Sequence, residues 1–444
     1  MQSNAHPHGL ASFMFSVFLL LYSIYSCEAL VQDESLPAFD LQPWREEAMA
    51  HEESAKYEAA ALSNVIPGAC YSPFHNAEYP LFGGSASGLN AAMYADFALM
   101  KNYVSVVRTY YSSYYGIPVT PAAAASGVKL YLGVFMTDEN WYGGQVDDAI
   151  NAVKQYPDTI VAILVGNENI APVGPYSPQD VAKRVAAVKQ RLRDIGRGDV
   201  PVGTVQRATD WLDSPRRNDM LALAAACDIV GVNIYPFFDN NYDAAYPLVI
   251  LNGVWDLMLQ VYPESKLRLT EVGYPTGGGA PSYAPRNIPS TANAQRFYNA
   301  FINWNPSRGG GEAFWFMFFD RRPDDNSMQA ELEKYFGFFT YDRKSKAPDF
   351  PARLTAINQA AAQVTVSTPT PTPAPKPAPV PTTTVPRTTT PPPKTVPRTT
   401  TPSPTTVRPT STPSPAPVVT TVSVSSSSGS VGANVCRVRK VFYG

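Results

Sequence analysis

The sequence of 444 residues predicts an α/β protein, a (β/α)8 TIM barrel followed by a disordered Thr/Pro-rich tail. Three observations support this fold class. Short apolar, β-rich runs alternate with Ala-rich stretches of helical period between residues 65 and 360, and eight such runs can be counted. After these runs, no acidic residue follows Asp349 and no aromatic residue stands between Phe350 and Phe442. Eight strand–helix units in about 295 residues match a closed barrel in number and size.

The chain begins with an apolar segment that resembles an export signal. Residues 10–26 are apolar and are followed by the small-residue pattern Cys27-Glu28-Ala29, which predicts a signal peptide over residues 1–29. The alternative is an N-terminal membrane anchor. No later window offers about 18 uninterrupted apolar residues, so no membrane span is expected after cleavage. The protein is therefore expected to be secreted, extracellular or cell-wall associated.

Residues 30–65 are acidic and Ala-rich, in a pattern that permits a solvated helix. This segment is interpreted as an N-terminal extension or propeptide. The barrel is then expected to occupy residues 66–360. The eight apolar runs are residues 65–71, 103–110, 128–135, 160–165, 200–205, 229–234, 267–270 and 312–319.

Helical stretches separate these runs, including residues 147–155 and 178–195. In the second, apolar residues recur at helical spacing, namely at Val181, Val185, Val188 and Leu192. Continuous apolar strands that alternate with helices indicate a parallel sheet covered on both faces. An open doubly wound sheet is the alternative, but residues 83–88 lack the spacing of a dinucleotide-binding glycine loop.

The C-terminal segment, residues 361–444, has the composition of a disordered stalk. No acidic residue follows Asp349, and 18 of the 43 prolines fall between Pro369 and Pro417. Such a segment cannot bury enough apolar surface to offset its ordering entropy. It also contains an internal repeat, because residues 384–391 recur as residues 395–402. We expect a semi-rigid spacer that is a candidate for O-glycosylation.

The net charge and the cysteine content argue against a nucleic-acid-binding protein and against a metal site. A net charge of −2 argues against a nucleic-acid-binding protein, which needs a basic excess. Signal removal leaves Cys70, Cys227 and Cys436, an odd number with no metal-ligand spacing. Cys70 and Cys227 are either bridged or, as the preferred interpretation, buried free thiols. We expect no metal, no cofactor and a monomer.

Two glutamates follow buried strands in the same manner. The run 160–165 leads into Gly166-Asn167-Glu168, and the run 267–270 leads into Glu271. Catalytic residues of such barrels lie at the carboxyl ends of strands, and the fourth and seventh strands stand across the barrel from each other. Paired carboxylates are what glycoside hydrolysis requires, one as acid and one as nucleophile or base. The alternative for either glutamate alone is a helix-cap neighbour or a loop salt bridge.

These motifs together resemble glycoside hydrolase family 17, the secreted β-1,3-glucanases and glucan transglycosylases, nearer to its fungal-type members. The resemblance rests on residues 166–168, 228–236 and 270–275, with weaker support from residues 107–110 and 129–134. It implies a retaining mechanism acting on β-1,3-glucan. Glu168 would be the acid/base and Glu271 the nucleophile.

The same resemblance implies further substrate-binding residues. Asn167 would hydrogen-bond the sugar 2-hydroxyl, and Tyr235 would orient the nucleophile. Tyr71 and Trp315, at the ends of the first and eighth strands, would be apolar platforms for sugar rings, or else part of the barrel packing. Asp138 would line the cleft, or else belong to a solvated loop.

The chain also departs from the family pattern along the cleft walls. Tyr111 stands where the family often has Gly, and Cys70 replaces a usual Asn. Tyr274 replaces a frequent Trp, and Arg321 replaces an acidic residue. The departures affect subsite preference and the balance of hydrolysis and transfer, while both glutamates are retained.

The sequence therefore predicts a retaining endo-type β-1,3-glucan hydrolase. A cell-wall-remodelling glucan transglycosylase is the first alternative, because water and a sugar hydroxyl can both resolve a glycosyl-enzyme. A non-catalytic glucan-binding wall protein is the second, and the presence of both glutamates disfavours it.

Overall fold

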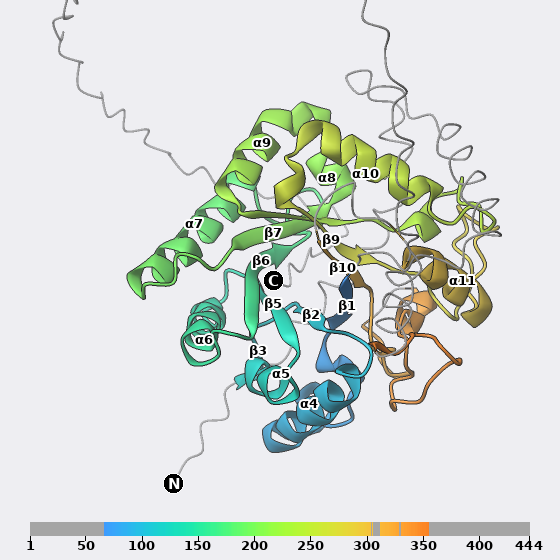
Figure 1. The fold of residues 1–444 in the computed structure, drawn as a ribbon, viewed down its shortest axis with the longest axis horizontal. Coiled ribbons are helices and arrows are strands. Elements are labelled where there is room, and N and C mark those ends of the chain that lie inside the picture. The colour runs from blue at the N-terminus through green and yellow to red at the C-terminus, as the bar shows by residue number, and fades with distance from the viewer. Residues whose placement is uncertain (1–65, 303, 305–310, 328–329, 355–444) are drawn as a thin grey trace, which may run out of the picture. The chain divides into compact units, whose positions relative to one another are not determined.

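The computed structural model describes residues 66–302, 304, 311–327 and 330–354 (Figure 1). The predicted signal peptide (residues 1–29), acidic extension (30–65) and Thr/Pro-rich stalk (361–444) lie outside the described residues, as does Cys436. These three assignments therefore stay predictions. Within the described ranges, no helix combines the length and apolar content needed to cross a membrane.

Eight parallel strands close into a barrel in the order β1-β10-β9-β8-β7-β6-β5-β2, which confirms the predicted fold class. Each predicted apolar run overlaps one barrel strand, and β6, β7 and β9 extend two residues beyond the end of their runs. The strands are β1 Ile66–Tyr71, β2 Val106–Thr109, β5 Lys129–Val134, β6 Ile160–Asn167, β7 Val202–Arg207, β8 Ile229–Asn233, β9 Leu267–Val272 and β10 Glu312–Trp315. A small antiparallel hairpin, β3 Ser113–Tyr114 and β4 Ile117–Pro118, follows β2.

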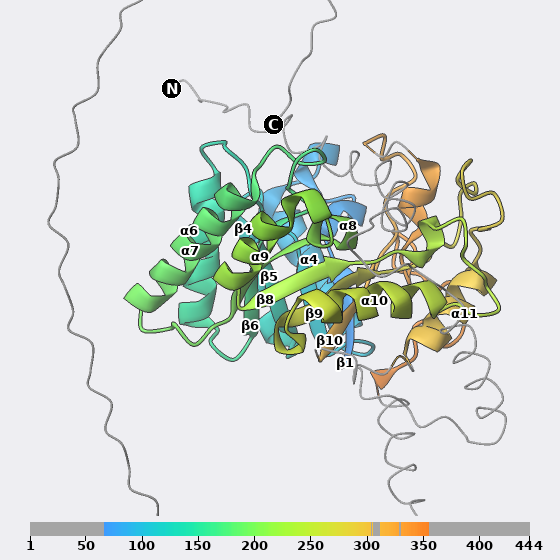
Figure 2. The ribbon, with the colours of Figure 1, turned by 90° about the horizontal axis from the view of Figure 1, so that it is seen from above.

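Helices cover the outside of the strands, as Figures 1 and 2 show for α6, α7, α9 and α10. They are α4 Ala86–Met100, α5 Thr120–Ser126, α6 Tyr142–Gln155, α7 Pro178–Asp194, α8 Ala208–Trp211, α9 Arg217–Ala226, α10 Val249–Val261 and α11 Thr291–Phe301. In α7 the Ser177 hydroxyl accepts from the Asp180 amide and Pro178 occupies the first turn, so the helix starts where predicted. Its four periodic apolar residues are all buried.

Two strands, β2 and β10, are four residues shorter than predicted, each for a local reason. β2 begins at Val106 because Tyr103 still lies in the turn that follows α4, where its amide donates to the Met100 carbonyl. β10 ends at Trp315 because its pairing with β9 shifts register there. The amide of Met317 then donates to Phe336, and that of Phe318 to Cys70, so the chain leaves the strand ladder.

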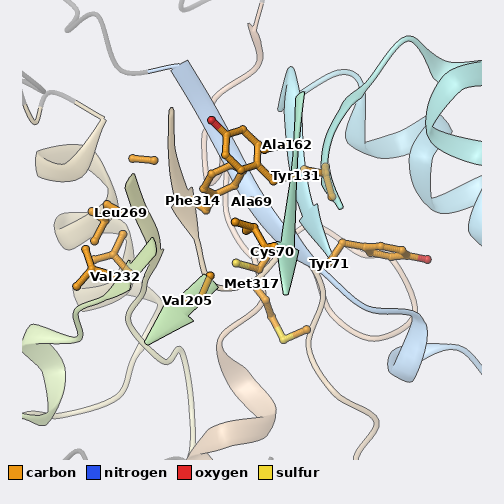
Figure 3. Packing of buried hydrophobic residues seen from close by; sticks show 14 of the residues in the cluster. Ala69, Cys70, Tyr71, Tyr131, Ala162, Val205, Val232, Leu269, Phe314 and Met317 are labelled. Atoms are coloured by element: carbon orange, nitrogen blue, oxygen red, sulfur yellow. The ribbon is translucent and has the colours of Figure 1, made fainter. Parts of the chain in front are cut away.

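The barrel interior is filled at its middle by Phe314 and Tyr131, whose rings meet edge to face at 4.9 Å (Figure 3). Gly68 leaves room for them, since a Cβ there would lie 2.9 Å from the Phe314 ring. Cys70 follows on the same inward face, toward the carboxyl ends of the strands. Inward residues beyond this apolar layer are therefore presented at the barrel mouth.

Candidate active site

Glu168 and Glu271 lie at the carboxyl ends of β6 and β9, the fourth and seventh barrel strands in chain order. Glu168 follows the last residue of β6, and Glu271 is the penultimate residue of β9. Both are buried, with exposures of 4% and 5%. Sequence reasoning placed both carboxylates at this end of the barrel, and the structure agrees.

The backbone at Glu168 has an unusual conformation. Its φ of +49° lies in the left-handed region that non-glycine residues rarely adopt, and Gly166 just before it has φ +77°. A Cβ at Gly166 would lie 2.1 Å from Asn169 Oδ1. The Glu168 amide donates to the Val205 carbonyl at 2.8 Å, which fixes the turn against β7. Such strain costs on the order of 1–3 kcal/mol and is concentrated at functional sites.

Glu271 accepts three hydrogen bonds. Arg108 Nη1 donates to Oε1 at 2.5 Å and the Tyr110 hydroxyl donates to the same oxygen at 2.7 Å. The Tyr235 hydroxyl donates to Oε2 at 2.5 Å. Burial raises the pKa of both tyrosines, and the neighbouring Glu271 charge adds to the effect, so both remain protonated donors. The guanidinium compensates the carboxylate charge, and the three donors fix its orientation.

Asn167 and Asn233 connect the two carboxylates. Asn233 Nδ2 donates to Glu168 Oε1 at 2.6 Å and to Asn167 Oδ1 at 3.2 Å. Arg108 Nη2 donates to the same Asn167 oxygen at 2.5 Å. A continuous set of hydrogen bonds therefore runs from Glu168 through the two amides and Arg108 to Glu271.

The surroundings of Glu168 favour its protonated form. Burial and the nearby Glu271 charge raise the pKa of Glu168 from 4.5 to about 8, against the opposing effects of Arg207 and the Asn233 hydrogen bond. A protonated carboxylic acid thus faces a carboxylate held by a cation and two phenols. This division is the one that lets one carboxyl group donate a proton while the other reacts as an anion.

Among the other predicted residues, the structure brings Asn167 and Tyr235 to the carboxylate pair through the contacts above. It does not do so for Tyr71 and Trp315. The Tyr71 hydroxyl donates to Asp96 of α4 at 2.7 Å, and Figure 3 shows the ring directed away from the barrel interior. Trp315 stacks on Phe338 at 5.1 Å and packs against α11 residues such as Tyr298.

The platform role given to Tyr71 and Trp315 is therefore corrected to barrel packing. Adjacent strand residues point to opposite faces, and Cys70 and Phe314 take the inward positions beside them. Asp138 lies on the loop after β5, where Arg184 of α7 forms an ion pair with it. Its side chain is 76% exposed, as in the solvated-loop alternative.

Sequence reasoning missed three residues of the pair's immediate surroundings, namely Arg108, Tyr110 and Asn233. A signal for them existed. Arg108 and Tyr110 are two residues apart along extended chain, so their side chains point to the same face of the sheet. Asn233 is a polar residue at the end of an otherwise apolar strand. A charged or amide side chain in a buried strand needs hydrogen-bond partners. Those that point into the barrel, such as Arg108 and Asn233, bond to the two carboxylates.

The sequence left open whether Cys70 and Cys227 form a disulfide bond, and the structure shows that they do not. Cys70 and Cys227 are both free and buried, as preferred. Cys70 Sγ lies 3.4 Å from the Thr270 carbonyl oxygen and 3.9 Å from Arg108 Nη1. The thiol thus packs beside the site as a small, weakly polar group.

A family model described as the BtgE/BtgC glycoside hydrolase domain matches residues 68–337. A glucan 1,3-beta-glucosidase of Arthroderma benhamiae is 26% identical over 268 residues, covering 56% of this chain and 82% of that protein. A probable beta-glucosidase, btgE, of Aspergillus terreus is 29% identical over 242 residues, covering 53% of this chain and 40% of that protein.

The matched region thus spans most of the first relative but less than half of the second. Among solved structures, an active-site mutant of the Rhizomucor miehei beta-1,3-glucanosyltransferase in complex with laminaritriose aligns with a TM-score of 0.50 and 19% identity. The alignment covers 64% of this chain and 96% of that chain. This similarity supports the barrel fold.

Proposed function

The chain belongs to the BtgE/BtgC glycoside hydrolase domain family, and on that premise we propose that it cleaves β-1,3-glucan by a retaining double displacement. Glu168 is the acid/base and Glu271 the nucleophile. The relatives' names motivate the substrate, since they include a glucan 1,3-beta-glucosidase and probable glucan endo-1,3-beta-glucosidases. A neutral polysaccharide also fits a chain whose net charge is −2 and in which 12% of the residues are aromatic.

One observation carries the assignment of roles, namely the different partners of the two carboxylates. Glu271 faces Arg108, Tyr110 and Tyr235, three donors that suit an anionic nucleophile. Glu168 is buried and accepts a single amide hydrogen bond, from Asn233, which suits a carboxyl group that carries a proton at the start of the reaction.

The first step forms a covalent glycosyl-enzyme. A Glu271 oxygen attacks the anomeric carbon while Glu168 gives its proton to the glycosidic oxygen, so the C–O bond breaks and the leaving chain departs as an alcohol. In the second step the Glu168 carboxylate takes a proton from water, and the hydroxyl oxygen attacks the anomeric carbon. This breaks the ester to Glu271 and returns both residues to their initial states.

The donors around Glu271 act in both steps. Tyr235 and Arg108 hold the carboxylate in one orientation before attack, and they stabilise the negative charge that returns when the ester breaks. Asn167, hydrogen-bonded to Arg108, is positioned beside the reacting carboxylates to contact the sugar 2-hydroxyl, a contact that strengthens in the transition state.

To test the activity, the full chain is incubated with a linear β-1,3-glucan and new reducing ends are measured. Replacing Glu271 with Gln should lower the rate by at least about 1000-fold. Glu312→Gln is a matched control, because Glu312 is also a strand carboxylate but lies at the opposite end of β10, paired with Arg268. Absence of products from the wild-type protein, or equal rates for Glu271→Gln, would refute the proposal.

Azide rescue separates the two roles. With an aryl β-glycoside that needs no acid, Glu168→Ala should accumulate the glycosyl-enzyme and yield a β-glycosyl azide. Glu271→Ala should instead yield an α-glycosyl azide, because azide then enters the side that the nucleophile has vacated. The reverse pattern would exchange the two assignments.

Glucan transglycosylation is the second candidate, and the surroundings of Tyr235 favour it. The rings of Phe238, Phe316 and Phe336 lie within 6 Å of the Tyr235 ring, at 5.8, 5.9 and 5.9 Å. Phe238 and Phe336 are buried, whereas Phe316 keeps part of its surface exposed. The Phe316 ring can therefore offer an apolar face to an acceptor sugar, while the buried rings exclude water from the vicinity of Tyr235. Products longer than a defined oligosaccharide substrate would show transfer, whereas only shorter products would show hydrolysis.

A further inference from the structure

We propose that the side chains of Tyr111, Phe135 and Trp141, called here the aromatic platform, bind a glucosyl unit at the barrel mouth, away from the carboxylate pair. This inference rests on the proposed function and specifies how that site selects longer glucan chains. Neither Phe135 nor Trp141 belongs to the strand-end motifs, and Tyr111 is one of the chain's departures from the usual pattern.

The three rings lie in nearly parallel planes. The Tyr111 and Phe135 centroids are 4.4 Å apart with an interplanar angle of 4°, and those of Phe135 and Trp141 are 5.5 Å apart at 23°. Tyr111 and Trp141 are 6.3 Å apart at 20°. Tyr111 is buried, whereas Phe135 and Trp141 each keep part of their surface exposed. The platform therefore has an inner ring for support and two outer rings that solvent can reach.

The platform lies at the same end of the barrel as the carboxylates. Tyr111 directly follows Tyr110, whose hydroxyl donates to Glu271. Phe135 directly follows Val134, the last residue of β5. The two strands pair in parallel, with Arg108 opposite Tyr131, so their carboxyl ends emerge side by side.

Hydrogen bonds hold the platform in place before any ligand arrives. The Ser112 amide and hydroxyl bond to Gln145 Oε1 and to the Gln145 carbonyl, at 2.9 and 2.7 Å. Gln145 Nε2 donates to the Ser113 carbonyl at 2.8 Å. Gln145 belongs to α6, and Trp141 is the N-cap of the same helix. One helix thus fixes both ends of the platform, which lowers the entropy lost on binding.

The chemistry of the platform matches a pyranose ring. A β-linked glucosyl unit has flat faces of C–H groups, which are buried favourably against an aromatic ring, and a rim of hydroxyl groups. Beside the rings, the half-buried Glu139 accepts from Trp141 Nε1 at 2.6 Å. Its carboxylate has further acceptor capacity for a sugar hydroxyl. An apolar surface with a few fixed polar groups is the usual composition of a small-molecule site.

The test compares Trp141→Ala with the wild type on β-1,3-gluco-oligosaccharides of increasing length, using the full secreted chain. We expect kcat/KM to fall about ten-fold on the longest substrates, mainly through KM, with little change on the shortest cleaved one. Trp141→Phe should recover most of the loss because it keeps a flat ring. Tyr94→Ala, which removes a 40% exposed aromatic ring from α4, serves as the matched control.

Binding is measured separately in the Glu271→Gln background, by calorimetric titration with the same oligosaccharides. Weaker binding of long but not short chains upon Trp141→Ala supports the platform, even if the wild-type protein were found to turn nothing over. Equal loss for every length, or no loss at all in binding and in kcat/KM, would overturn the inference. Lack of turnover alone would overturn only the proposed function.

Discussion

Glu168 and Glu271 are the same side chain in two environments, and the difference between them follows from a few neighbours. Glu271 is opposed by a guanidinium at 2.5 Å, whereas Glu168 is buried with one amide donor. Because desolvation penalises the charged form, burial and the nearby carboxylate favour the proton on Glu168. These different surroundings support the different roles, acid and anion, that we propose for two identical residues.

The pH dependence of cleavage should reflect this arrangement. Because the proposed mechanism requires protonated Glu168, kcat/KM should fall as the pH rises through the pKa of that group, well above the ordinary 4.5. Burial and Glu271 raise this pKa, and Arg207 lowers it, so Arg207→Met should move the alkaline limb to still higher pH. A pH profile of kcat/KM for both proteins is the measurement. A limb that stays in place or moves to lower pH would contradict the prediction.

The same burial should cost stability. The pKa of Glu168 is higher in the folded protein than in the unfolded chain. The folded state therefore becomes less stable as the pH rises from 4.5 toward 8, because the unfolded chain ionises first. Glu168→Gln cannot ionise, and its side-chain oxygen still accepts from Asn233. Its melting temperature should therefore match the wild type near pH 4 and exceed it by a few degrees at pH 8. Thermal unfolding at both pH values checks this, and an equal difference at both would count against it.

Among the elements, the turn after β6 contributes most directly to the site. Gly166→Ala would place a Cβ 2.1 Å from Asn169 Oδ1, at a φ of +77° that disfavours side chains. We expect the turn to shift and kcat to fall at least ten-fold while the barrel stays folded. Gly143→Ala is the control, since a Cβ there meets nothing within 4 Å. Circular dichroism and kcat together distinguish a shifted turn from an unfolded chain.

A second contact between elements centres on Asp96, which joins α4 to β1 and to the loop that contains Arg343. Asp96 of α4 accepts from the Tyr71 hydroxyl, Asn76 Nδ2 and Arg343 Nε at 2.7, 2.9 and 2.7 Å, and His75 Nε2 lies 3.0 Å away. Asp96 is fully buried, so its removal would leave buried partners without an acceptor.

Asp96→Ala should accordingly lower the free energy of unfolding by about 3–5 kcal/mol. The exposed pair of Asp147 and Arg191 offers a comparison, because Asp147→Ala should cost less than about 1 kcal/mol. Denaturant unfolding of both variants is the test. Similar losses in the two would show that the α4 contact adds nothing beyond a surface ion pair.

The apolar runs of the sequence were sufficient to predict the barrel, because buried parallel strands need continuous apolar residues. They also placed Glu168 and Glu271, since polar residues that follow such runs emerge at one end. The inward or outward direction of each strand residue was harder to predict. Tyr71 and Trp315 were placed at the right strands but on the wrong face, because an apolar strand buries both faces and shows no alternation.

The alternation of side-chain direction along each strand could have resolved this ambiguity. If Arg108 and Cys70 point inward, as their shared register requires, then Tyr71 must point outward to α4. The aromatic platform was beyond the reach of sequence analysis for a different reason. Its rings come from three separate loop positions, and their stacking depends on how Gln145 ties the β2 loop to α6.

For the molecule as a whole, the hydrogen bonds of the carboxylate pair within the described part of the chain involve residues 108 to 271, all in the barrel. The predicted stalk over residues 361–444 contributes none of the catalytic groups that we propose. A protein ending at residue 360 should therefore keep the same kcat/KM on soluble oligosaccharides, within about two-fold. Assay of both lengths checks this, and a large loss in the shorter protein would assign the C-terminal segment a part in catalysis.

The closed barrel also determines when activity can first exist. The ion pair of Arg108 and Glu271 joins residues 163 positions apart, and β1 is paired with β10, the last strand made. Such distant contacts form only after most of the chain has been ordered. A ribosome-bound or truncated chain that lacks β9 would contain the proposed acid, Glu168, but neither the proposed nucleophile, Glu271, nor a closed barrel mouth. Synthesis and catalysis are thereby separated in time, and incomplete chains are expected to be inert toward glucan.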